Sequence, residues 1–241
     1  MDGVRVITFD LDNTLWDVAE VILKAEQKMR SWLDVEAPEY SERFDQEAIL
    51  LLRKQIVAAD PHLRHDLSAL REEVLFQAIS LCGYPTGQAR VMASKAFREF
   101  FDARHEVVYF TGALEVLETL SADYQLGALT NGNANVEKLG LDRFFSFAFC
   151  SADVGASKPA PEMFRAALDH CGAQPRQSIH IGDHLIDDIL GADSVGMFTI
   201  WVNHKRTTLP IGGAEPTSTV NCLRELPECV AEIFARSSPS T

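Results

Sequence analysis

The sequence predicts an α/β fold built on a doubly wound parallel sheet, and three features of the chain support this prediction. A short apolar, β-branched segment near the N-terminus ends in an acidic turn, and a long helical stretch without strands follows it. Beyond Phe110, segments typical of strands alternate with segments typical of helices. Because such alternation produces a mainly parallel sheet with helices on both faces, we expect a Rossmann-like core into which the helical stretch is inserted.

The expected strands are short runs rich in β-branched and apolar residues. The first is Val4–Phe9, and the later ones are Gln125–Thr130, Ser146–Cys150, Ser178–Ile181 and Met197–Val202. The helices expected between and after them are Pro161–Cys171, Leu185–Val195 and Val220–Ala235. We also expect a surface loop around Gly212, Gly213 and Pro216, and a polar tail over Ser237–Thr241.

The inserted stretch has the three- and four-residue spacing of amphipathic helices. Its clearest apolar face consists of Leu67, Leu70, Val74, Ala78 and Leu81. Prolines at positions 38, 61 and 85 separate the stretch into about four helices. We therefore predict two domains, an α/β core formed by residues 1–15 and 106–241 and a helical domain formed by residues 16–105.

Composition limits the classes of function. The chain has 241 residues, of which 46% are hydrophobic, and it contains no apolar run of ~18 residues, so no membrane-spanning helix is expected. A net charge of −13 argues against a nucleic-acid or anionic-membrane partner, since either requires a basic surface. Five scattered cysteines without a CxxC pair, and an N-terminus without a secretory signal, favour a cytoplasmic protein. Nothing requires an oligomer, so a monomer or a small homo-oligomer is expected.

Polar residues follow the predicted strands, where a doubly wound sheet carries its functional site. They are Asp10 and Asp12 after the first strand, Thr130 and Asn131 after the second, Lys158 before the Pro161 helix, and Asp183, Asp187 and Asp188 after the Ser178–Ile181 strand. Carboxylates gathered at one edge of a sheet repel one another and stay ionised together only around a cation. A hard divalent ion with oxygen ligands, Mg²⁺, fits this set.

The same residues stand in the order of the four motifs of the haloacid dehalogenase superfamily, which the chain resembles. The DxDxT motif corresponds to Asp10–Thr14, the strand-end hydroxyl to Thr130, the lysine to Lys158, and the acidic motif to Gly182–Asp188. Any one motif is weak evidence, whereas four in order are strong. The position of the helical stretch, between the first two motifs, resembles the subfamily with a C1-type cap, so the resemblance implies that residues 16–105 form a cap domain.

The resemblance implies a mechanism with an aspartyl-phosphate intermediate on Asp10. Asp12 would protonate the leaving oxygen and then activate the hydrolytic water. Mg²⁺ would be held by the side chains of Asp10 and Asp183 and the backbone carbonyl of Asp12. Asp187 and Asp188 fit the two spacings known for the acidic motif, and we favour Asp188 as the carboxylate that supports Lys158 or the metal. The phosphoryl oxygens would be bound by Lys158, the Thr130 hydroxyl and the Asn131 backbone N–H.

The expected substrate is a small phosphorylated metabolite. The dehalogenases of this superfamily release a halide, which needs no proton, and lack an acid at the position of Asp12. Two stretches, Leu52–Asp66 and Thr130–Ala134, resemble bacterial phosphatases that act on flavin mononucleotide and on 5-amino-6-(5-phosphoribitylamino)uracil. For such a substrate Trp16 would stack on the ring and Arg64 would pair with an anion or a carbonyl.

Other functions remain open at this stage. A related phosphatase could act on phosphoglycolate, a sugar phosphate or a nucleotide, and a phosphomutase could use the same core. A receiver-type phosphorylation switch is disfavoured, because receiver domains are about half as long and carry their acidic pair before the phosphorylated aspartate. A catalytically inactive scaffold is disfavoured because every motif residue is present.

Overall fold

The computed structural model describes residues 4–209 and 212–237, and these form two compact units. The first unit combines the N-terminal segment through Asp17 with the chain from Val108 onward, and the second is Val18–Val107. That the second unit acts as a cap stays a prediction.

Within the described residues, the first unit contains a six-stranded sheet in the order β3-β2-β1-β4-β5-β6, with every neighbouring pair parallel. The strands are β1 (Val6–Phe9), β2 (Gln125–Thr130), β3 (Phe145–Cys150), β4 (Ser178–Gly182), β5 (Phe198–Val202) and β6 (Ser218–Val220). The first strand in the sequence therefore lies between strands that come more than 100 residues later, as the prediction requires. All four residues of β1 are buried, which agrees with their apolar, β-branched character.

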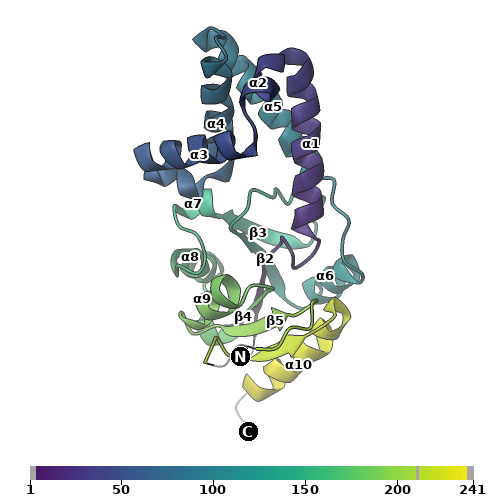
Figure 1. The fold of residues 1–241 in the computed structure, drawn as a ribbon. Coiled ribbons are helices and arrows are strands. Elements are labelled where there is room, and N and C mark those ends of the chain that lie inside the picture. The colour runs from purple at the N-terminus through teal and green to yellow at the C-terminus, as the bar shows by residue number, and fades with distance from the viewer. Residues whose placement is uncertain (1–3, 210–211, 238–241) are drawn as a thin grey trace. The chain divides into compact units, whose positions relative to one another are not determined.

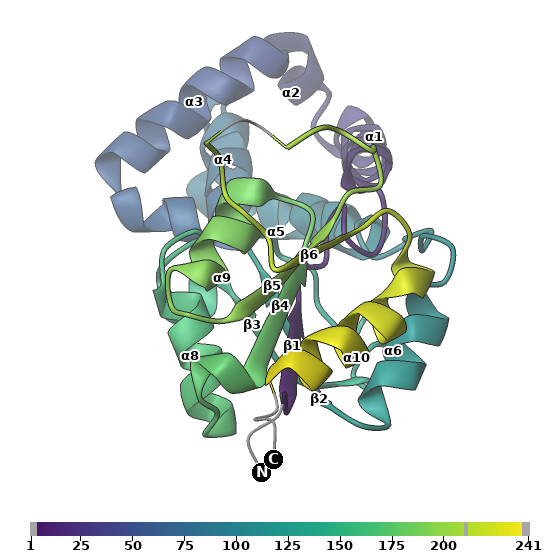
Figure 2. The ribbon, with the colours of Figure 1, turned by 90° about the horizontal axis from the view of Figure 1, so that it is seen from below.

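Helices cover both faces of this sheet, which confirms the predicted doubly wound fold (Figures 1 and 2). On one face lie α6 (Ala113–Ser121) and α10 (Leu226–Ser237), and on the other lie α8 (Glu162–Cys171) and α9 (Gly191–Asp193). The remaining helical segments are α7 (Ser151–Val154), the 3₁₀ turns Pro175–Gln177 and Leu223–Glu225, and a π-helix, η3, at Leu185–Leu190.

Two predicted helices of the core differ from the structure. The segment predicted as one helix over Val220–Ala235 begins with the last residue of β6 and a 3₁₀ turn, and α10 starts only at Leu226. Val220 pairs with Val202 of β5, so the sheet takes the β-branched residue that the periodicity had given to the helix. The segment predicted over Leu185–Val195 opens as a π-helix rather than an α-helix. The predicted tail beyond Ser237 lies outside the described residues.

The second unit is helical, as predicted, but with five α-helices among its described residues rather than about four. They are α1 (Val18–Glu36), α2 (Pro38–Arg43), α3 (Gln46–Ala59), α4 (Leu67–Leu81) and α5 (Thr86–Ala103), with a 3₁₀ helix, η1, at Pro61–His65. Pro38 begins an additional short helix, since proline is accepted in a first helical turn. Asp45 and Asp66 cap α3 and α4 by accepting hydrogen bonds from the backbone N–H groups of Ala48 and Ala69.

The apolar core of the second unit lies between α1, α4 and α5. The buried face of α4 consists of Leu70, Val74, Leu75, Ala78 and Ile79. Leu81, which the periodicity placed on this face, is 51% exposed, because the buried stripe turns toward Leu75 and Ile79. The buried face of α5 includes three alanines that let the helices approach closely: Ala89, Ala93 and Ala96.

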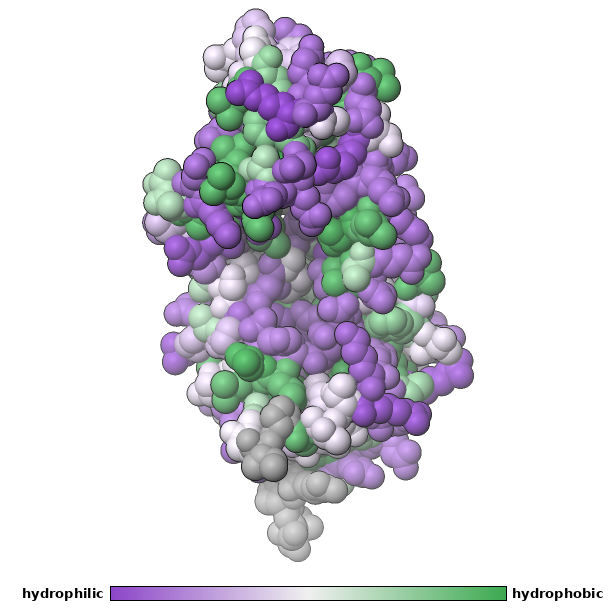
Figure 3. Space-filling view, in the orientation of Figure 1, coloured by the Kyte–Doolittle hydropathy of each residue, from purple (hydrophilic) through white to green (hydrophobic). Residues whose placement is uncertain are grey.

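Figure 3 shows one face of the surface, on which hydrophilic residues predominate and hydrophobic ones are interspersed. In the part of the chain that the structure describes, no helix has the length and hydropathy needed to cross a bilayer.

Candidate active site

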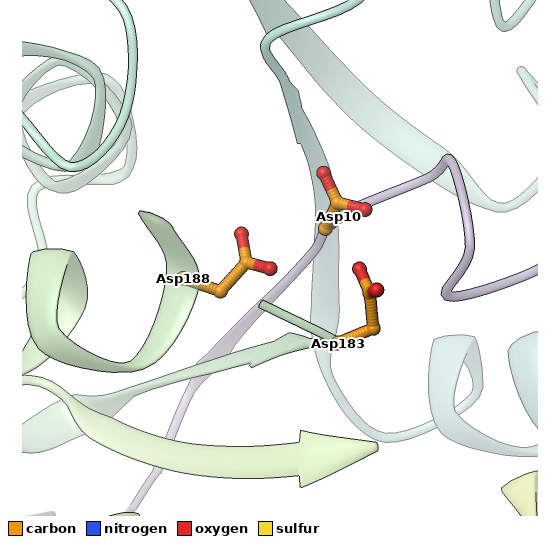
Figure 4. A group of neighbouring side chains, drawn as sticks. All are labelled: Asp10, Asp183 and Asp188. Carbon is orange, nitrogen blue, oxygen red and sulfur yellow. The ribbon is translucent and has the colours of Figure 1, made fainter. Parts of the chain in front are cut away.

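Two neighbouring strands bring the main acidic residues to one edge of the sheet. Asp10 directly follows β1, and Asp183 directly follows β4, which pairs with β1 in register from Val6 to Phe9. The backbone N–H of Asp10 donates to the carbonyl of Ile181 at 2.8 Å, so the pairing continues to the site itself. Asp188 reaches the same place from η3, and the three carboxylates lie close to one another (Figure 4).

Lys158 is the buried cation of this cluster. Its Nζ donates to Asp10 Oδ1, to Asp188 Oδ1 and to the carbonyl of Leu129, each at 2.7 Å. Its side chain is only 1% exposed, so the ion pairs form in a poorly solvated environment. Such burial is tolerated only when each charge has close partners, and all three N–H groups of the ammonium have one here.

One ammonium cannot compensate three carboxylates. Burial disfavours the charged form of Asp188, but Lys158 and a hydrogen bond with His180 outweigh it and hold the pKa of Asp188 below its usual range. For Asp10 burial dominates and raises the pKa to about 8, although Lys158 acts in the opposite direction. Although both carboxylates contact the same lysine, the pKa is lowered for Asp188 and raised for Asp10, because Asp188 accepts hydrogen bonds from additional donors. Burial and the Asp188 charge raise the pKa of Asp183 to about 6.

This excess of negative charge is what a divalent cation would offset. Oxygen atoms of Asp10, Asp183 and Asp188 lie within 4.8 Å of one another. Two ligands on opposite sides of Mg²⁺ stand about 4.2 Å apart, so the set is close to the size that this ion requires. All-oxygen ligation is also the type that Mg²⁺ prefers. The residues present therefore fit the predicted ion.

A buried network that the sequence did not reveal holds Asp188. Its Oδ2 accepts from the backbone N–H of His184 at 2.9 Å, and its Oδ1 lies 3.2 Å from Nε2 of His180. Nδ1 of His180 lies 2.8 Å from the hydroxyl of Thr8. Burial lowers the pKa of His180, which favours the neutral ring. We infer that Nε2 carries the proton and donates to Asp188, while Nδ1 accepts from Thr8.

The sequence left open whether Asp187 or Asp188 supports Lys158 or the metal, and the structure places these two carboxylates in different environments. Asp188 is buried and contacts Lys158, whereas the Asp187 side chain is 35% exposed and lies beside His184. Asp188 therefore has the position that we favoured, and its contribution to activity stays a prediction.

The glycine of the acidic motif makes room for Asp188. A Cβ atom at position 182 would overlap the Asp188 side chain, although the backbone conformation itself suits any residue. We expect Gly182→Ala to displace Asp188 and Lys158 and to lower kcat/KM by about 10²-fold, a loss that a misplacement of about 1 Å can cause. Steady-state kinetics measures this effect. Gly87→Ala, at a helical glycine with open space around it, is the matched control, and equal losses in both variants would contradict the explanation.

The turn after β1 orients the first two aspartates. Asn13 adopts a positive φ of 63°, which asparagine tolerates better than most residues. The Thr14 hydroxyl donates to Asp10 Oδ2 at 3.2 Å, and the indole N–H of Trp16 donates to Asp12 Oδ1 at 2.9 Å. Side chains from within the turn therefore hold both carboxylates.

This placement corrects the predicted role of Trp16. Its side chain is 0% exposed and packs edge-on against Tyr109 at 5.8 Å between ring centroids. A ring enclosed in this way cannot stack on a substrate, so the expectation of ring stacking is wrong. The apolar ring fills the core, and its N–H takes the buried hydrogen bond that an indole requires.

Asn131 has a structural role that the sequence did not indicate. Its side-chain Oδ1 accepts from the backbone N–H of Lys158 at 2.7 Å, and its Nδ2 donates to the backbone carbonyl of Lys158 at 2.9 Å. It thereby fixes the backbone from which the lysine side chain reaches Asp10. Thr130 is buried at the end of β2, and its hydroxyl oxygen accepts from the Gly132 N–H at 2.9 Å. Phosphoryl binding by either residue stays a prediction.

The acidic cluster opens into a small cavity of about 170 Å³. It is lined by Asp10, Asp12, Asn13, Asn131, Lys158, Asp183, His184, Asp187 and Asp188. Pockets that enclose whole ligands typically measure about 300–1,000 Å³. This cavity is therefore suited to a phosphoryl-sized group and an ion, and the remainder of a substrate must lie outside it.

Two further residues are Arg64, which the sequence predicted to bind substrate, and Trp201, which it did not predict as part of the site. Arg64 lies in η1 of the helical unit, is exposed, and donates from Nε to the Pro61 carbonyl at 2.9 Å. Its role in substrate binding stays a prediction. Trp201, the penultimate residue of β5, donates its indole N–H to the Asp183 carbonyl at 2.8 Å and so supports the loop that carries this carboxylate.

A parallel sheet that presents an aspartate pair, a buried lysine and an acidic loop at one edge defines a class of hydrolase. Residues 4–196 match the family model described as haloacid dehalogenase-like hydrolase. The match spans most of the chain, and the chain belongs to this family.

Similar proteins of this family differ in their named activities. The 5-amino-6-(5-phospho-D-ribitylamino)uracil phosphatase YigB of Escherichia coli is 30% identical over 83% of this chain and 83% of its own. A glyceraldehyde 3-phosphate phosphatase of Pyrococcus furiosus is 29% identical over 100% of this chain and 97% of its own. A crystal structure of a 2-haloacid dehalogenase from Pseudomonas syringae pv. Tomato superimposes with a TM-score of 0.92 at 37% identity, covering 98% of this chain and 100% of that one.

Proposed function

We propose that this protein is a Mg²⁺-dependent phosphatase that hydrolyses a small phosphomonoester through an aspartyl-phosphate on Asp10. The observation that carries the proposal is the cluster of Asp10, Asp183 and Asp188 around Lys158, with Asp12 in the lining of the same cavity. The bound ion would be held by Asp10, Asp183 and the backbone of Asp12, with Asp188 in support, and would supply positive charge to the phosphoryl oxygens.

In this mechanism Asp10 attacks phosphorus in line, and the bond to the leaving oxygen breaks. The contacts of Asp10 with Lys158 and Thr14 hold its carboxylate in place for the attack. Asp12 gives its proton to the leaving oxygen and later takes a proton from the water that hydrolyses the acyl phosphate. Lys158, the Thr130 hydroxyl and the Asn131 N–H stabilise the phosphoryl charge.

Dehalogenation is the second candidate, because the structurally similar protein from Pseudomonas syringae is named a 2-haloacid dehalogenase. In that reaction a carboxylate would displace a halide from carbon. A halide leaves without a proton, so in that reaction Asp12 would have no leaving group to protonate. Phosphate-ester hydrolysis uses both Asp12 and the cation site, and we therefore favour it.

The leaving group would lie outside the small cavity, and we propose that the helical unit, Val18–Val107, acts as the cap that recognises it. Similarity to the YigB phosphatase supports a ribityl phosphate as substrate. Flavin mononucleotide, which the sequence resemblance suggests, also carries a phosphorylated ribityl chain. Arg64 is our candidate for an anion or carbonyl contact in that unit. The glyceraldehyde 3-phosphate phosphatase relative keeps a three-carbon or sugar phosphate as the alternative, and a phosphomutase would use the same core.

The test is a parallel assay of phosphate and halide release. We expect Mg²⁺-dependent release of inorganic phosphate from p-nitrophenyl phosphate and no halide from 2-chloropropionate. In a panel of flavin mononucleotide, phosphoglycolate, glyceraldehyde 3-phosphate, sugar phosphates and nucleoside monophosphates, flavin mononucleotide should have the highest kcat/KM. If kcat/KM for flavin mononucleotide is at least tenfold below that of the other substrates, only the flavin assignment fails. Halide release without phosphate release would refute the phosphatase proposal. An isomeric phosphate ester as product would identify a mutase.

A further inference from the structure

The indole of Trp16 is held rigidly beside Asp12. Besides the 2.9 Å hydrogen bond from Nε1 to Asp12 Oδ1, the Trp16 carbonyl accepts from the Asn13 N–H at 2.8 Å. The backbone of Trp16 forms isolated β-bridges to Asp12 on one side and to Tyr109 on the other. The ring is fully enclosed and packs against Tyr109. Both the backbone and the ring therefore fix the direction of this N–H.

We infer that Trp16 is a positioning residue for proton transfer by Asp12. This inference rests on the proposed phosphatase function and adds a residue to its mechanism. An indole N–H can only donate, so it occupies Oδ1 as an acceptor in either protonation state of the carboxyl. The acidic proton of Asp12 is consequently carried by Oδ2, and the plane of the carboxyl group is fixed relative to the cavity.

Fixing this plane matters because the torsion of a carboxyl group is broad and a general acid must approach within about 2.6–3.2 Å of its partner. Without the indole N–H, Asp12 would sample orientations that do not reach the leaving oxygen. The loss would appear only in steps that require a proton. A purely structural role of Trp16 would instead reduce the rates of all substrates together.

The test compares two single-ring monoesters that differ in their need for a proton. Benzyl phosphate releases an alcohol and needs general acid catalysis, whereas p-nitrophenyl phosphate releases a phenolate that leaves unaided. We expect Trp16→Phe to lower kcat/KM for benzyl phosphate by about 10- to 100-fold, a part of the 10²–10⁴-fold that general acid catalysis contributes. The effect on p-nitrophenyl phosphate should be less than about threefold. The ratio kcat/KM is used because it reports phosphoryl transfer to Asp10 and not the later hydrolysis.

Two controls isolate the hydrogen bond. Tyr109→Phe keeps the ring that packs on Trp16 and removes only a hydroxyl that donates to the Leu139 carbonyl, so both substrates should react normally. In an Asp12→Asn background, Trp16→Phe should no longer change the ratio between the two substrates. If Trp16→Phe does not fold, replacement of Trp16 by 3-benzothienylalanine, in which sulfur takes the place of N–H, makes the same comparison.

The outcomes separate this inference from the proposed function. Suppose that Asp12→Asn selectively loses activity on benzyl phosphate, while a folded Trp16 variant keeps the wild-type ratio of kcat/KM between the two substrates. That result overturns the role of Trp16 and leaves the phosphatase proposal intact. Wild-type protein that hydrolyses neither ester, or an Asp12→Asn variant without leaving-group selectivity, overturns the mechanism and the inference together.

Discussion

Replacement of the proposed nucleophile, Asp10→Asn, should lower kcat/KM for p-nitrophenyl phosphate by about 10⁴-fold or more. The amide has nearly the shape of the carboxylate but cannot form the acyl phosphate, so the covalent route is lost and not merely slowed. The measurement is steady-state phosphate release together with acid-quench trapping of phosphorylated protein, which should be detectable in wild type and absent in the variant.

The fold should survive this substitution. Asp10→Asn removes one of three crowded carboxylates, and Lys158 keeps its contacts with Asp188 and the Leu129 carbonyl. We expect an unfolding temperature within about 4 °C of wild type, the shift that corresponds to about 1 kcal/mol in a protein of this size. Asp187→Asn is the matched control, because this carboxylate borders the same cavity without touching Lys158, and it should lose less than tenfold. A near-normal kcat/KM in Asp10→Asn would refute the assignment of the nucleophile.

The sequence predicted the parts of the fold that depend on local pattern. β2 is correct at both ends and β1 is two residues shorter than predicted, because runs of apolar and β-branched residues determine a buried strand directly. β6 was missed, since three residues are too few for a period, and Val220 also continues the apolar spacing of the helix that follows. Its strand character comes from pairing with Val202, which no local window contains.

The site shows the same limit. Asp10, Asp183 and Lys158 could be identified because motif order and strand ends locate backbone positions. The partners of these residues could not be, because they depend on side-chain directions between distant segments. His180 looked like an ordinary strand residue, yet its ring joins Thr8, 172 residues away, to Asp188.

Trp16 illustrates the error that follows when side-chain direction is assumed. Its position just after the first motif suggested a ring exposed to substrate, whereas the turn with positive φ at Asn13 directs it into the core. The spacing of four residues between Asp12 and Trp16 could have suggested a contact between their side chains, because a tight turn can bring such a pair together. Only the backbone conformation establishes that it does.

Removal of divalent metal should abolish turnover, with a loss of more than about 10³-fold after dialysis against EDTA and full recovery with Mg²⁺. The physical reason is the charge at the site, where Asp10, Asp183 and Asp188 face a single ammonium and an anionic phosphoryl group would add to the excess. Burial already raises the pKa of Asp10 to about 8 without an ion, so a nucleophile that is ionised at neutral pH needs an added positive charge nearby.

Thermal unfolding supplies a second readout that does not depend on catalysis. An ion that binds the native state alone stabilises it, by about 2.7 kcal/mol at one hundred times its Kd, so Mg²⁺ should raise the unfolding temperature of the metal-free protein. Asp183→Asn removes one of the proposed carboxylate ligands and should diminish that rise, whereas Asp193→Asn, on α9 and outside the cavity, should preserve it. Ca²⁺ is larger and prefers six to eight ligands, so it should stabilise the protein without restoring full turnover. Undiminished activity in excess EDTA, with no effect of Mg²⁺ on unfolding, would show that Lys158 and hydrogen bonds alone hold these carboxylates together.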